Sequence, residues 1–104
     1  MKKLMLIRHG STQNNSKVKD IERQLTQQGI KDSLSLGKFL RESNSVPDLI
    51  ISSSAQRAKT TANNLIAGGV LKSIYLVEEA IYGGNSNFLL YLLSEQGNSY
   101  NNIC

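Results

Sequence analysis

The residues most able to do chemistry lie near the N-terminus, in the stretch LMLIRHGST at positions 4–12. Arg8, His9 and Gly10 follow a short apolar run, and His9 is the only histidine among the 104 residues. Arginine binds phosphate oxygens through its fork of N–H donors. Histidine can attack phosphorus as a nucleophile, or it can transfer protons as a general acid or base. The stretch indicates chemistry on a phosphoryl group, although many unrelated chains contain Arg-His-Gly by itself.

A second set of candidate residues lies further along the chain. Arg57 follows the serines at positions 52–54, and Glu78 and Glu79 follow an apolar run that ends at Val77. Arg57 would add a second guanidinium to an anion site, and a carboxylic acid could protonate a leaving oxygen. Each group also has a simpler interpretation. Arg57 could be a solvated helix residue, the serines a helix N-cap, and either glutamate an exposed loop charge.

Apolar periodicity predicts the elements that would position these residues. Three short runs rich in Ile, Leu and Val are typical of parallel strands covered on both faces, namely Lys3 to Ile7, Asp48 to Ser52 and Ser73 to Val77. The segments between and after these runs have apolar residues at helical spacing and are predicted to be helices. The first has Thr26 as its N-cap and Arg41 near its end, and the second runs from Ala55 to a stop at Gly68 and Gly69. A third, with Leu89, Leu92 and Leu93, opens at Asn85 or Ser86 and closes at Gly97.

This alternation predicts an α/β domain with a parallel sheet and right-handed crossovers. Ligands of such sheets bind beyond the carboxyl ends of the strands. We therefore expect Arg8 and His9, at the end of a central strand, to share one edge with Arg57 and a glutamate. The simpler interpretations of these residues do not require that convergence.

Composition favours one domain over residues 1–104, and a chain of this length supports a modest core. No apolar run approaches the roughly 20 residues of a membrane helix, and the N-terminal run stops at Arg8 without a cleavage site, so we expect a cytoplasmic protein. The net charge of +4 indicates an anionic partner, but the basic residues are scattered, which favours phosphate on a small substrate over nucleic acid. Cys104 is the only cysteine, which excludes an internal disulfide.

Four stretches together resemble one known family. They are LIRHGST at 6–12, ERQLTQQG at 22–29, PDLIISSSAQRAKTTA at 47–62 and YGGNSNFLLYLL at 82–93. The chain resembles the histidine phosphatase superfamily, which includes the phosphoglycerate mutases, and within it the small branch typified by the phosphohistidine phosphatase SixA. The resemblance implies a single histidine phosphatase domain, a three-layer α/β/α sandwich with a mainly parallel sheet.

The resemblance also implies roles for individual residues. His9 would accept the phosphoryl group, Arg8 and Arg57 would bind phosphate, and Gly10 would keep the backbone near the pocket open. Asn15 stands where many family members place a phosphate-contacting asparagine. Glu79 precedes the Tyr82-Gly83 pair by three residues, as the acid of mutase-like members does, whereas SixA-like members often lack an acid there. No metal or cofactor is required, because the arginines neutralise the phosphate charge.

In one respect the sequence departs from the family. The resemblance implies a second catalytic histidine in a Gly-His pair after a fourth strand, and the letters NNIC at 101–104 stand where that strand would open. We therefore expect the final strand or strands to be missing. The sequence could be a partial reading of a longer gene, a natural remnant with little activity, or a phosphate-binding module without turnover.

The expected function is hydrolysis of a phosphohistidine, carried by a protein, or of a small phosphomonoester, by a monomer. A mutase passes through the same intermediate, but the chain has no insertion that could form a lid to exclude water.

Overall fold

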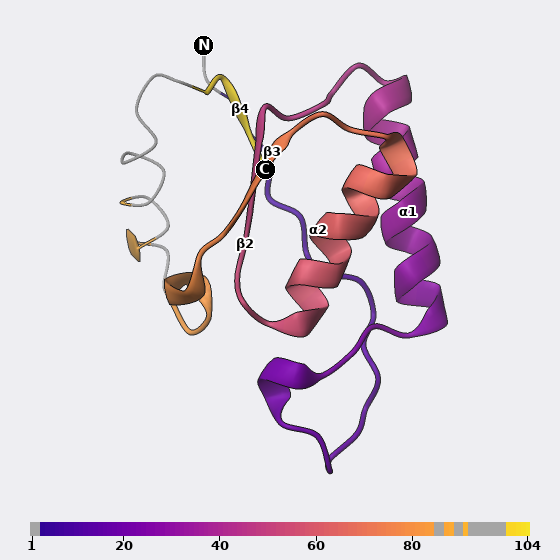
Figure 1. Ribbon diagram of the computed structural model, residues 1–104, viewed down its shortest axis with the longest axis vertical. Coiled ribbons are helices and arrows are strands. Elements are labelled where there is room, and N and C mark those ends of the chain that lie inside the picture. The colour runs from indigo at the N-terminus through magenta and orange to yellow at the C-terminus, as the bar shows by residue number, and fades with distance from the viewer. Residues whose placement is uncertain (1–2, 85–86, 89–90, 92–99) are drawn as a thin grey trace.

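The structure, a computed structural model, describes residues 3–84, 87–88, 91 and 100–104. Strands and helices alternate along the chain, as predicted (Figure 1). In order they are β1 (Lys3–Leu4), the 3₁₀ helix η1 (Asp20–Glu22), α1 (Gln27–Glu42), β2 (Leu49–Ser52), α2 (Gln56–Gly69), β3 (Ile74–Val77), the 3₁₀ helix η2 (Glu79–Ile81) and β4 (Asn102–Ile103). Of the helix predicted between Asn85 and Gly97, residues 87, 88 and 91 are described and are helical, and the rest of it lies outside the described residues.

The described strands form one four-stranded sheet with the order β1-β4-β2-β3, and every pairing is parallel. The last residues form a strand, as the resemblance implied. Ile103 of β4 lies beside both Leu4 of β1 and Leu49 of β2. Because β4 is inserted between them, β1 lies at the edge of the described sheet, whereas the sequence predicted a central first strand.

The strand predicted over residues 3–7 is shorter in the structure, where β1 spans Lys3–Leu4. After Leu4, the N–H of Met5 still donates to the carbonyl of Ile103 at 2.8 Å, and regular pairing then ends. The prediction of strands covered on both faces holds for β2 alone. Leu4 is 49% exposed and Leu76 of β3 is 43% exposed, whereas the side chain of Ile50 is buried against α2.

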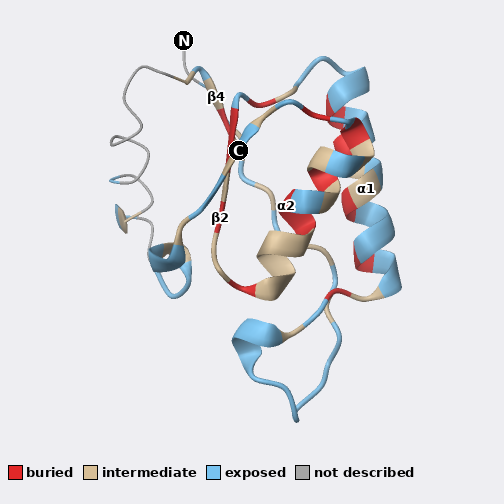
Figure 2. Cartoon of the chain, viewed as in Figure 1, coloured by how far each residue is buried: buried red, intermediate tan, exposed pale blue. Residues whose placement is uncertain are grey.

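Helices α1 and α2 pack closely against each other beside the sheet, and the buried residues gather on β2 and on the facing sides of the helices (Figure 2). Thr26 caps α1 as predicted, since its side chain accepts a hydrogen bond from the N–H of Gly29 at 3.0 Å. Helix α2 runs through the two glycines predicted to stop it. Val70 takes the left-handed conformation instead, because Gly68 lies against the backbone of Leu34 inside the helix pair.

In the described part of the chain, no helix is long and apolar enough to cross a membrane.

The helix crossing gives a prediction about stability. A Cβ atom on Gly37 of α1 would overlap the carbonyl oxygen of Leu65 on α2, and backbone atoms cannot move aside as a flexible side chain can. Gly37→Ala should lower the free energy of unfolding by about 1–3 kcal/mol in urea denaturation. Ser35→Ala, at an exposed position of the same helix, should change it by less than about 0.5 kcal/mol. Equal stability of the two variants would contradict the close crossing.

Candidate functional site

Arg8 and His9 lie where two hollows meet, beyond the carboxyl ends of the described strands. One is a cavity of about 300 Å³, mostly apolar, between the segment after β1, the end of β2 and the inner face of α2. The other, of about 410 Å³, is lined by residues 8–12 alone. Arg8 and His9 line both hollows, so an anionic group in one and an apolar group in the other would meet at these two side chains.

The imidazole of His9 is half-buried and is oriented by the backbone carbonyl of the next residue. Nδ1 lies 2.8 Å from the carbonyl oxygen of Gly10. A carbonyl oxygen can only accept, so Nδ1 donates this hydrogen bond. In the neutral ring the other nitrogen, Nε2, then carries a lone pair and no proton. Nε2 is thus the atom of His9 that can act as a nucleophile or a base.

Gly10 holds the loop after β1 between the two helices. Its N–H donates to the Thr61 hydroxyl at 3.1 Å, and that hydroxyl donates to the carbonyl of Arg57 at 2.8 Å. On the other side, a Cβ atom on Gly10 would lie 2.7 Å from the carbonyl oxygen of Gly29 in α1. Gly10 is one of the residues that line the hollow of about 410 Å³, and its missing side chain also lets the loop approach α1.

The guanidinium of Arg57 is bound by an acidic residue from another part of the chain. It donates from one nitrogen to the carbonyl oxygen of Asp20 at 2.8 Å and from another to Asp20 Oδ2 at 3.2 Å. The Tyr82 hydroxyl donates to the same Oδ2 at 2.6 Å, and the Tyr82 ring lies 5.9 Å from Arg57 Cζ. Arg23 lies 3.7 Å from Asp20 Oδ1. We call Asp20, Arg23, Arg57 and Tyr82 the Asp20 cluster.

The cluster shifts the pKa values of both acids in it. The hydrogen bond from Tyr82, followed by that from Arg57 and the nearby positive charges, lowers the pKa of Asp20 below its ordinary value of 3.8. The same hydrogen bond to Asp20 raises the pKa of Tyr82. Asp20 is therefore a carboxylate at neutral pH, and it supplies the negative charge beside Arg57. Outside the cluster, Cys104 lines the apolar cavity beside His9, and burial raises the pKa of its thiol to about 11.

The structure brings only part of the expected site together. Arg8, His9 and Gly10 share one hollow, and Ser52 and Ser53 line the neighbouring cavity with His9. The guanidinium of Arg57 faces Asp20, and Arg57 is not among the residues that line either hollow.

Asn15 and the glutamates also lie apart from the hollows. Asn15 is exposed, and its Oδ1 accepts a hydrogen bond from the N–H of Lys17 at 3.0 Å. Glu79 is exposed at the start of η2, and Glu78 caps that helix by accepting from the N–H of Ala80 at 3.4 Å. The roles assigned to Asn15 and Glu79 stay predictions.

Two contacts were missed from the sequence. The Thr61 contact could have been predicted, because Thr61 lies one helical turn after Arg57 in the stretch RAKTTA and therefore on the same face of the helix. The Asp20 contact could not, because an acidic residue in a polar loop cannot be told from an ordinary solvated charge by its sequence. Among the described residues, no group of three or more His, Cys, Asp or Glu side chains could hold a metal ion.

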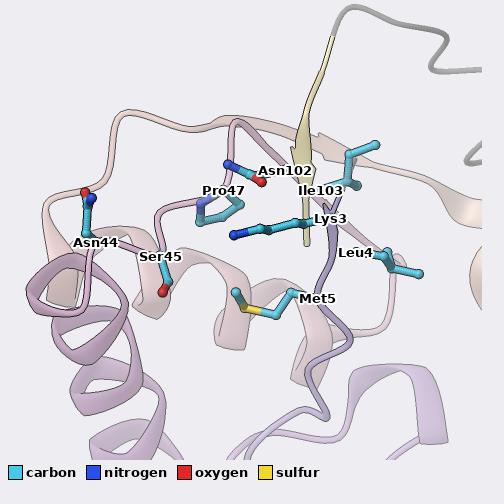
Figure 3. Close-up of a pocket in the computed structure, with 8 residues that line it drawn as sticks. All are labelled: Lys3, Leu4, Met5, Asn44, Ser45, Pro47, Asn102 and Ile103. Atoms are coloured by element: carbon cyan, nitrogen blue, oxygen red, sulfur yellow. The ribbon is translucent and has the colours of Figure 1, made fainter. Parts of the chain in front are cut away.

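A further cavity, of about 360 Å³, lies at the opposite ends of the strands. Lys3, Pro47 and Asn102 line it where β1, β2 and β4 begin, and the Lys3 side chain crosses it (Figure 3). Asn44, on another wall, takes the left-handed conformation just after α1. This cavity contains none of the candidate residues.

Comparison with known proteins assigns the family. A family model of the histidine phosphatase superfamily (branch 1) matches residues 4–79, which include Arg8, His9, Arg57 and Glu79. The chain belongs to the histidine phosphatase superfamily. A comparison with curated proteins gives no match.

Solved structures of other histidine phosphatases share the fold. A protein described as phosphohistidine phosphatase SixA from Nakamurella multipartitia superposes with a TM-score of 0.82 at 22% identity, over 98% of this chain and 56% of that one. A protein of the same description from Agrobacterium tumefaciens superposes with a TM-score of 0.86 at 21% identity, over 96% of this chain and 65% of that one. The protein histidine phosphatase SixA complexed with tungstate superposes with a TM-score of 0.80 at 20% identity, over 96% of this chain and 64% of that one. The chain thus spans between about half and two thirds of the length of these proteins.

The Thr61 contact can be tested by removing one oxygen atom. Thr61→Val keeps the shape of the buried side chain but leaves the N–H of Gly10 without its partner. We expect the free energy of unfolding to fall by about 1–2 kcal/mol in urea denaturation. Thr60→Val is the matched control, because the Thr60 hydroxyl accepts a hydrogen bond from the Gln56 side chain of the same helix at 3.2 Å. A loss no larger than that of the control would show that the hydroxyl does not hold the loop.

The pKa of Asp20 gives a second prediction. Because folding lowers this pKa, the cluster stabilises the protein above the ordinary value of 3.8, and that contribution is lost as the pH falls through the folded pKa. Tyr82→Phe should raise the pKa of Asp20 in a carboxyl NMR titration and reduce stability at neutral pH, but not at strongly acid pH. Tyr75→Phe, whose hydroxyl bonds Ser52, should leave the titration of Asp20 unchanged. An unchanged Asp20 titration in Tyr82→Phe would rule out the hydrogen bond as the cause.

Proposed function

We propose that the chain is part of a phosphatase that hydrolyses a phosphohistidine or a small phosphomonoester through a covalent phosphohistidine at His9. The observation that carries the proposal is the orientation of the imidazole. Nδ1 is held by the carbonyl of Gly10, so Nε2 is free to attack, and Arg8 lies beside it at the junction of the two hollows. Membership of the histidine phosphatase superfamily supports the same chemistry.

The proposed reaction has two steps. Nε2 of His9 attacks phosphorus, the bond from phosphorus to the leaving group breaks, and the leaving atom takes the electron pair and then a proton. Water next attacks the phosphoryl group on His9, the P–Nε2 bond breaks, and the electron pair returns to the imidazole as inorganic phosphate forms. Arg8 balances charge on the phosphoryl oxygens in both steps. Arg57 would take part by turning its guanidinium from Asp20 towards the phosphoryl group.

The leaving group decides whether an acid is needed. An alkoxide requires a proton as it departs, and Glu79 is the residue that we propose for this role with phosphomonoesters. An imidazole is a better leaving group than an alkoxide, so a phosphohistidine substrate would need less help. The exposed position of Glu79, outside both hollows, favours the phosphohistidine substrate.

The similar structures support a phosphorylated protein as partner. All three are described as SixA, two as a phosphohistidine phosphatase and one as a protein histidine phosphatase, and the third is complexed with tungstate. Tungstate is a tetrahedral oxyanion with the shape of phosphate.

A second candidate function is phosphate binding without turnover. Arg57, which the family resemblance assigns to the transferring phosphoryl group, is bound to Asp20 and does not line either hollow. Loss of one such group commonly costs about two to three orders of magnitude in rate. Calorimetry with inorganic phosphate, run beside a turnover assay on the same protein, separates the two functions. Binding without turnover supports the binding module.

The covalent intermediate gives the decisive test of the first function. Incubation with a labelled phosphoryl donor should give an adduct that is labile in acid and stable in base. His9→Ala should carry no label, and Arg8→Gln should form it about two to three orders of magnitude more slowly. Lys38→Gln, which removes a charge from an exposed position on α1, should label like the wild type. Equal labelling of His9→Ala would contradict the mechanism.

A further inference from the structure

The carboxylate of Asp20 occupies the place at Arg57 that an anionic ligand would take. It accepts from the Arg57 guanidinium at 3.2 Å and from the Tyr82 hydroxyl at 2.6 Å, and Arg23 lies 3.7 Å from its other oxygen. Two guanidinium groups and a phenol are the kind of donors that bind a phosphoryl group. The Asp20 cluster is thus an anion site already filled by a side chain of the same molecule.

We propose that Asp20 is an internal competitor of the phosphoryl group, which keeps Arg57 outside the His9 hollows until a substrate anion displaces the carboxylate. The inference rests on the proposed function, because it takes Arg57 as a phosphate-binding residue. It adds a second conformational state of Arg57, in which the guanidinium is released from Asp20 and turned towards His9. The anion binds that second state.

The different exposure of Asp20 and Arg57 favours replacement of the Asp20 carboxylate by a phosphate anion. The Asp20 side chain is 55% exposed, and it lies on η1, which contains no buried residue, so the freed carboxylate can be hydrated. The Arg57 side chain is only 14% exposed, so it must keep an anionic partner or lose much of its hydration. One anion replacing another satisfies this requirement.

Release of Arg57 would also remove a hydrogen-bond donor from a carboxylate that joins two loops. Asp20 connects η1 to Tyr82, which directly follows η2, across 62 positions of sequence. Ile81 of η2 lines the apolar cavity beside His9. Substrate binding at Arg57 is therefore coupled to the loop that borders this cavity. The apparent affinity for phosphate is the intrinsic affinity multiplied by the fraction of molecules in which Arg57 is free of Asp20.

Inorganic phosphate is the probe for this inference, with its affinity measured by calorimetry or NMR titration. Asp20→Asn keeps the shape of the side chain but removes its charge, and it should tighten phosphate binding by about three- to fivefold. Glu22→Gln is the matched control, since it removes the same charge from an exposed position on the same 3₁₀ helix, outside the Asp20 cluster. Its effect should be clearly smaller, and in an Arg57→Gln background Asp20→Asn should no longer tighten binding.

A spectroscopic measurement follows the same event in the unmodified protein. Phosphate should shift the ring signals of Tyr82, because Arg57 leaves the face of that ring, and raise the pKa of Asp20, because the carboxylate loses the Arg57 guanidinium as a donor. These changes should be absent in Arg57→Gln.

The outcomes separate this inference from the proposed function. Weaker phosphate binding by Asp20→Asn than by the wild type would overturn the inference alone, because Asp20 would then position Arg57 for the ligand. Equal tightening by Glu22→Gln would also overturn it, since a general charge effect would explain the result. Absence of phosphate binding by both the wild type and Asp20→Asn would overturn the proposed phosphate site itself.

Discussion

The loop that carries His9 depends on close contact between backbone atoms. Gly10 lies against Gly29 of α1 and donates its N–H to Thr61 of α2, so one residue without a side chain fixes the loop to both helices. The helices can hold it because they are themselves close, with Gly37 against the backbone of Leu65. The carbonyl of the same Gly10 then accepts from His9 Nδ1 and sets the direction of the ring. A Cβ atom at any of these glycines would separate surfaces on which the imidazole depends.

The local part of this arrangement could be predicted from the sequence, and the non-local part could not. Thr26 as an N-cap and the alternation of strands with helices follow from short-range preferences of the chain. The insertion of β4 between β1 and β2 joins residues about one hundred positions apart, and no local pattern encodes the order of strands. Gly68 was interpreted as a helix stop because glycine is common at helix ends, whereas its use here is in packing.

The same division applies to the candidate site. Arg8, His9 and Gly10 are consecutive, so the one segment after β1 places them together, and their grouping could be predicted. The direction of the Arg57 guanidinium depends on Asp20, 37 positions away, and on Tyr82. Side chains in exposed loops make such contacts without a hydrophobic pattern to reveal them. Glu79 and Asn15 were assigned by spacing alone, and spacing does not fix where an exposed side chain points.

The two arginines assigned to phosphate differ in a way that suits successive stages of binding. Arg8 is exposed beside His9, so its charge reaches an approaching anion through water. Arg57 is largely covered, and its charge is balanced by Asp20 in the free protein. A covered guanidinium that faced an empty hollow would lack both hydration and a counter-charge. On the proposed function, Asp20 removes that cost in the free protein, because its carboxylate balances the charge of Arg57. The substrate must then compete with Asp20 for Arg57. The affinity for phosphate is therefore set by the difference between the free energies with which phosphate and the Asp20 carboxylate bind Arg57.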